Sequence, residues 1–112
     1  MHADRAFELG VGYLEGQEPE MALIAFGEAI RLDPKMAQAF NGRAVAFGLT
    51  GDFQKALADA CEALRLDPWE PEYLRTRSYV YEQLGDKENA AADLEKADHL
   101  AAQWAARTEA KS

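Results

Sequence analysis

Few residues of this sequence have the types and spacing that catalysis or metal binding requires. The two histidines, His2 and His99, have no partner at the spacing of metal ligands. The single cysteine, Cys61, excludes an internal disulfide and a multi-cysteine zinc site, and we interpret it as a structural thiol. The sequence contains no phosphate-cradling glycine loop and no nucleophile elbow. It therefore predicts a protein that is not an enzyme and that uses no metal or cofactor.

Charge and hydropathy exclude further classes of function. The 112 residues include 20 acidic and 12 basic side chains, a formal net charge of -8, whereas a nucleic-acid surface needs a basic footprint. No apolar run approaches the ~18 residues of a membrane span. The first residues lack the basic and then apolar layout of a signal peptide, so we expect a cytoplasmic protein with no membrane partner.

The chain repeats itself at an interval of 34 residues. The recurring positions are Leu32-Asp33-Pro34 and Leu66-Asp67-Pro68, then Ala22, Ala56 and Ala90, then Ala29, Ala63 and Ala97, and the aromatic residues Tyr13, Phe47 and Tyr81. This period predicts one domain over 1–112, with repeats at 3–36, 37–70 and 71–104 and a helical extension and tail at 103–112.

Each period predicts two helices. In the second period, Gly51 suits the left-handed position after a helix, and Asp52 suits the N-cap of the next one. Asp67-Pro68 then ends that second helix, because proline disfavours a helical residue before it. In the third period Ala102 replaces this proline, so the last helix should continue. The predicted helices are 3–15, 19–32, 36–50, 53–66, 70–84 and 87–108.

These residues resemble the tetratricopeptide repeat (TPR) family, which has a 34-residue helix–turn–helix unit. The small eighth position is Gly10, Ala44 and Ser78, and the aromatic eleventh position is Tyr13, Phe47 and Tyr81. The bulky twenty-fourth position is Phe26, Ala60 and Leu94, so the middle repeat departs from the pattern. The resemblance implies an all-α fold, an α-solenoid of three stacked hairpins in a right-handed superhelix. It also implies a concave groove that binds a partner peptide or helix without catalysis.

The resemblance also implies which residues line the groove. An apolar strip with two central polar donors is predicted from Phe7, Val11, Leu14, Asn41, Val45, Leu49, Arg75 and Tyr79. Its edges carry Glu8, Glu15, Glu72 and Glu82. We therefore expect a protein or peptide partner with apolar anchors and some positive charge. The alternative is that several of these residues pack between neighbouring helices.

One class of ligand is disfavoured at this stage. The family members that grip the C-terminal tail of Hsp70 or Hsp90 use lysine, asparagine and arginine at five groove positions. This sequence has Phe7, Val11, Gly42, Glu72 and Thr76 there. A carboxylate needs charge-assisted donors, so such a tail is not the expected partner.

Two further expectations concern architecture. The seventh and twenty-third positions change together, from Leu9 and Ala25 in the first repeat to arginine and aspartate in the others. This covariation predicts the ion pairs Arg43–Asp59 and Arg77–Asp93. An array without a separate capping helix also leaves its ends open. The rival function is therefore self-association into a homo-oligomer, or a place within a longer array.

Overall fold

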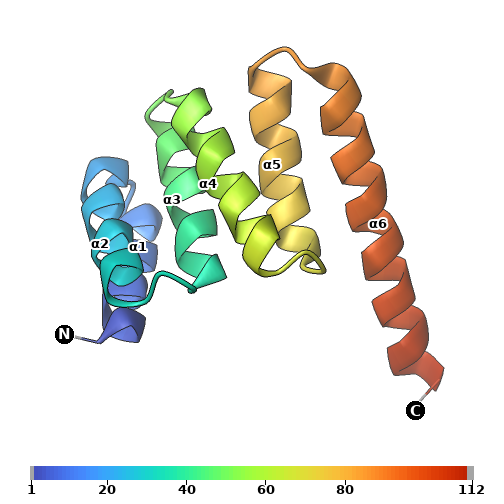
Figure 1. Cartoon of the computed structure of the whole chain (residues 1–112), viewed down its shortest axis with the longest axis horizontal. Helices are drawn as coiled ribbons and strands as arrows, with labels where there is room; N and C mark the ends of the chain where they lie inside the picture. The colour runs from blue at the N-terminus through green and yellow to red at the C-terminus, as the bar shows by residue number, and fades with distance from the viewer. Residues whose placement is uncertain (1, 111–112) are drawn as a thin grey trace.

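The computed structural model describes residues 2–110 and contains six helices and no strand within that part (Figure 1). They are α1 (Ala3–Glu15), α2 (Pro19–Leu32), α3 (Ala37–Leu49), α4 (Phe53–Leu66), α5 (Pro71–Gln83) and α6 (Lys87–Ala110). The predicted all-α fold is confirmed. Helices α1, α2 and α4 have the predicted bounds, and α6 begins where predicted but ends two residues later. Helices α3 and α5 are shorter than predicted by one residue at each end. The ends of the predicted domain, residues 1 and 111–112, lie outside the described part.

The helix boundaries follow from local chemistry. Asp52 accepts a hydrogen bond from the backbone nitrogen of Lys55 and caps α4. Gly51 and Gly85 have positive φ angles of 84° and 83°, as a turn between two helices requires. In the first hairpin the matching residue is Gln17, with a φ of 60°, so a non-glycine residue bears the strain there. With no proline at 102, α6 runs on to Ala110 and passes the end of α5 (Figure 1).

The hairpins stack so that their first helices form an inner layer. α3 contacts both α1 and α5, whereas no contact joins α2 to α4 or α4 to α6 within the described residues. Each second helix instead contacts the first helix of the next hairpin. Because the first helices are closer together than the second helices, the stack curves around α1, α3 and α5, which face the concave side.

The apolar core is divided between the junctions of the stack. Phe26 is fully buried where α1, α2 and α3 meet, and its ring is 5.7 Å from that of Phe7 between centroids. A Cβ atom on Gly10 would lie 2.5 Å from Cε1 of Phe26, and one on Gly42 would lie 2.6 Å from it. Glycine at both positions therefore makes room for the ring. At the second junction Leu64, Tyr73 and Leu74 form a separate buried cluster.

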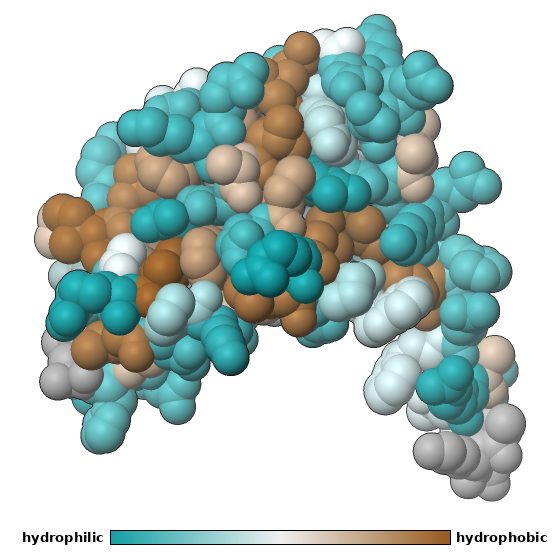
Figure 2. Space-filling model, viewed as in Figure 1, coloured by the Kyte–Doolittle hydropathy of each residue, from teal (hydrophilic) through white to brown (hydrophobic). Residues whose placement is uncertain are grey.

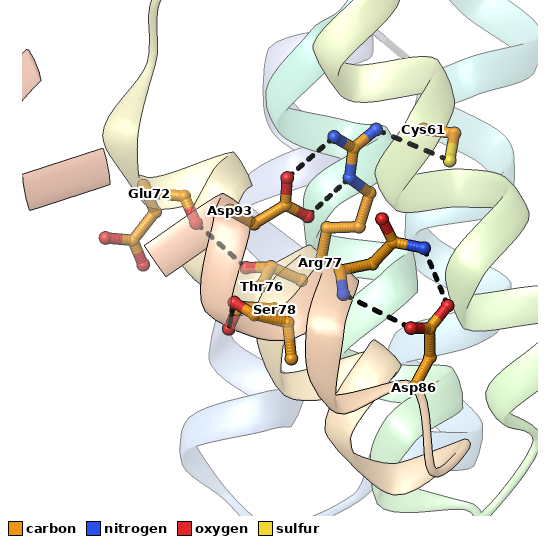
Figure 3. A network of polar contacts seen from close by, with 9 residues as sticks. Cys61, Glu72, Thr76, Arg77, Ser78, Asp86 and Asp93 are labelled. Carbon is orange, nitrogen blue, oxygen red and sulfur yellow. Dashed lines mark hydrogen bonds and ion pairs between the residues drawn. The ribbon is translucent and has the colours of Figure 1, made fainter. Parts of the chain in front are cut away.

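Both predicted ion pairs are present, each between the two helices of one hairpin. Arg43 Nε donates to Asp59 Oδ2 at 2.7 Å, and Arg43 Nη2 donates to Asp59 Oδ1 at 3.0 Å. Arg77 makes the same two-pronged contact with Asp93 at 2.7 and 2.8 Å (Figure 3). The hydrogen bond to Asp93 is the main reason that the pKa of Arg77 is raised above its ordinary value. The aspartates are buried, so the pairs fix hairpin geometry more than they add stability.

The glycine contacts of Phe26 give a first prediction. Gly42→Ala should lower the free energy of unfolding by about 1–3 kcal/mol, because a new methyl group overpacks a fully buried ring. Gly12→Ala is the matched control, since a Cβ there meets no atom within 4 Å and alanine favours a helix by about 0.5–1 kcal/mol. Urea unfolding measures both. Equal stability of the two variants would show that the ring is not held by these glycines.

The ion pairs give a second prediction. Asp59→Ala should cost about 2–3 kcal/mol, because it leaves Arg43 half-buried without a carboxylate. Adding Arg43→Leu recreates the apolar pair of the first hairpin and should restore most of the loss. A double-mutant cycle in urea measures the recovery. A double variant as unstable as the single one would contradict this account.

Candidate functional site

The predicted groove strip divides into a packed part and an exposed part. On α1, Phe7, Val11 and Leu14 are half-buried and pack against the cluster around Phe26. Their apolar surface is therefore partly used inside the fold. For these three residues the packing that the sequence left as an alternative is present in the structure.

The exposed part lies on α3 and α5. Leu49 is 60% exposed and Tyr79 is 50% exposed, with Val45 one turn before Leu49. Tyr79 crosses to α3, since its Cε1 atom would lie 3.4 Å from a Cβ on Gly48. We call Val45, Leu49, Arg75 and Tyr79 the α3–α5 patch. Three large apolar side chains are thus exposed together on the concave side of the stack.

The two polar donors predicted for the strip behave differently. Arg75, one turn before Tyr79, is exposed and makes no ion pair or hydrogen bond within residues 2–110. Its guanidinium is therefore available to a partner. Asn41 is half-buried, and its Oδ1 atom is buried with no hydrogen-bond partner in the described part. That acceptor cannot serve an incoming ligand without a movement of the side chain.

Exposed carboxylates lie on the inner helices α1 and α5. The rim residues predicted from the sequence, Glu8, Glu15, Glu72 and Glu82, are all exposed. Against them the patch offers one cation, Arg75. The concave side therefore attracts positive charge at its edges and a single negative group near its centre.

A second feature of the surface is a hollow of about 680 Å³ beside the α6 extension. Trp69, Pro71, Leu100 and Trp104 line it, and both tryptophans are 70% exposed. Figure 2 shows the α6 extension standing away from the body of the molecule on that side. The missing proline at 102 was the available signal, because it let α6 project past Trp69.

The candidates for other chemistry are few. Cys61 is half-buried at the junction of α4 and α5, and its Sγ lies 3.7 Å from Arg77 Nη1 (Figure 3). No group of three or more histidine, cysteine or acidic side chains that could hold a metal ion occurs among the described residues. Within the same residues, no helix is long and apolar enough to cross a membrane.

Comparison with known proteins supports the family that the sequence resembles. A model of the tetratricopeptide repeat matches residues 72–103. The chain is also 44% identical over 50 residues to tetratricopeptide repeat protein 36 of Xenopus tropicalis. Both matches support a tetratricopeptide repeat protein, the family that the sequence resembles. The matched segment is 45% of this chain and only 25% of that relative, so the chain spans about a quarter of the relative's length.

Solved structures show the same TPR fold over nearly the whole chain. MamA superposes with a TM-score of 0.85 at 21% identity, over 93% of this chain and 61% of MamA. The TPR domain of Arabidopsis OM64 gives 0.85 at 28% identity, over 88% of this chain and 81% of its own. The second TPR of Spaghetti (RPAP3), bound to the HSP90 peptide SRMEEVD, gives 0.86 at 23% identity, over 89% and 93%. The family match and the fold together support a protein–protein interaction module.

Proposed function

We propose that this TPR protein is a non-enzymatic adaptor whose concave side binds a partner peptide or helix. The observation that carries the proposal is the α3–α5 patch, where Leu49 and Tyr79 each keep half or more of their surface exposed among the described residues and Tyr79 reaches Gly48, the neighbour of Leu49. A soluble protein rarely leaves such apolar groups together in water without a use. We propose further that the three repeats over 1–112 act as one domain in the cytoplasm.

The chemistry of the patch defines the kind of partner. Val45, Leu49 and Tyr79 would receive apolar anchors, and the exposed glutamates of α1 and α5 would pair with basic residues of the same segment. Arg75 adds one contact for an acidic side chain or a backbone carbonyl. The partner that suits this patch is therefore an amphipathic segment with some positive charge.

An Hsp70 or Hsp90 tail does not suit this surface, although a structural neighbour holds an HSP90 peptide. Of the positions that the family uses for a terminal carboxylate, Gly42 is buried beneath Phe26 and Glu72 is exposed with the wrong charge. We therefore propose that this chain does not bind such tails.

The test compares two pairs of exposed apolar residues. Leu49→Ser with Tyr79→Ser should abolish specific partner capture from a cell extract, because these side chains are the proposed anchors. Met21→Ser with Ile24→Ser is the matched control, since both residues are comparably exposed but lie on α2. Affinity capture with quantitative mass spectrometry reads the result. A partner set that survives the α3–α5 change but not the α2 change would contradict the proposal.

A direct titration tests the ligand class. Isothermal titration of the chain with the peptide SRMEEVD should give no binding heat at concentrations where TPR receptors of such tails are saturated. Saturable binding that is lost in Arg75→Ala would overturn this part of the proposal.

A further inference from the structure

Helices α2 and α4 each use one face to pack on the first helix of the next hairpin. Helix α6 has an equivalent face, one repeat later. α2 packs on α3, and α4 packs on α5, but no helix of the described part packs on the same side of α6. Because the repeat is 34 residues long, the two inner junctions show what a helix placed on α6 would meet.

Three positions of the second helix contribute to the inner junctions, the first of them at the first junction only. Phe26 of α2 packs over Gly42 of α3. The residue four positions later in the same helix is apolar at both junctions. It is Ile30 at the first junction and Leu64, which lies in a cluster with Tyr73, at the second. Finally, the arginine of the incoming helix lies against the residue that follows position 26 or 60. Arg43 Nη1 is 3.9 Å from the point where a Cβ would stand on Gly27, and Arg77 Nη1 is 3.7 Å from Cys61 Sγ.

On α6 these three positions have different residues. Leu94 takes the place of Phe26 and is 47% exposed, whereas Phe26 is fully buried. Glu95 takes the place of Gly27 and Cys61, and Asp98 takes the place of Ile30 and Leu64. Both carboxylates are exposed. The face that receives the next helix has therefore kept an apolar centre and gained two negative charges.

We propose that this α6 face, formed by Leu94, Glu95 and Asp98, docks a basic amphipathic helix of another protein. The helix would take the place of a fourth hairpin's first helix. An arginine or lysine placed like Arg43 would meet Glu95, and a second one four residues earlier would meet Asp98. A small residue placed like Gly42, directly before the first of these cations, would cover Leu94. This surface is separate from the α3–α5 patch, so the inference does not depend on the proposed function.

A second copy of this chain does not fit as the occupant. Stacked head to tail, α1 would bring Arg5 to Asp98, which is favourable, but it would also bring Leu9 to Glu95 and Glu8 to Leu94. A carboxylate against an apolar side chain is unfavourable at both of the last positions. Two chains with a net charge of -8 each also repel one another.

The test uses a defined peptide. The probe is a fluorescein-labelled, alanine-rich helix of about 17 residues, long enough to be helical, with two arginines four residues apart. The reference probe carries glutamates in their place. The arginine probe should bind the full chain, move the amide NMR signals of residues 91–101, and weaken as salt is added. The glutamate probe should not bind.

Variants locate the binding surface. Glu95→Lys with Asp98→Lys should weaken binding of the arginine probe by about tenfold or more, because two attractive contacts become repulsive. Leu94→Ser should weaken it several-fold through the lost apolar contact. Glu18→Lys with Glu20→Lys changes the charge equally at the start of α2, away from both surfaces, and should leave the affinity within about twofold. Glu72→Lys with Glu82→Lys, the concave variant, tests whether the probe binds at the α3–α5 patch instead. All these residues are exposed, and circular dichroism verifies that each variant is folded.

Four results would overturn the proposal. The arginine probe could fail to bind. Equal losses in the α6 variant and the α2 variant with Glu18→Lys and Glu20→Lys would show attraction by net charge alone. A loss confined to the concave variant would place the probe at the α3–α5 patch. Finally, sedimentation velocity could show that the chain alone self-associates and that Glu95→Lys with Asp98→Lys stops it, which would make the occupant a second copy.

Discussion

The arrangement of the helices depends on one steric constraint, the fit of the Phe26 ring between Gly10 and Gly42. The ring brings three helices of two hairpins to a single point, and the absence of a Cβ on either glycine sets how closely they approach. This approach places α1 beside α3 in the inner layer and so creates the concave side. It also draws Phe7 into ring contact with Phe26, which places part of the apolar surface of α1 inside the fold. The exposed large apolar side chains predicted for the groove are therefore those on α3 and α5.

The elements of the fold could be predicted because their causes are local or periodic. Capping by Asp52, the turn at Gly51 and the stop at Pro68 each depend on a few neighbouring residues. The Arg43–Asp59 pair was predictable because an interior arginine needs a carboxylate, and the two changed together between repeats. Helix α6 was longer than expected by two residues, because nothing after Ala102 stops it.

The exposure of the site residues could not be predicted in the same way. Val11 packs against the cluster around Phe26, whereas Val45, at the same position of the next repeat, is exposed. The repeat pattern is the same for both, so it could not predict this difference. Asn41 was expected as a donor through its amide nitrogen, and what the repeat pattern did not indicate is that its Oδ1 acceptor is enclosed by the helix packing. The hollow at Trp69 and Trp104 joins a loop to a helix end about one repeat later, so the missing proline at 102 signals the longer helix but not its place beside the loop.

The contacts of this chain are almost all between elements adjacent in sequence. No helix of the first hairpin touches a helix of the third in the described residues. Such a chain closes only short loops as it folds, which is the condition for rapid folding. It also transmits tension through one junction at a time. If the molecule is pulled by its two ends, the hairpins should therefore unfold one after another, and not in one cooperative step as a protein with a single central core would.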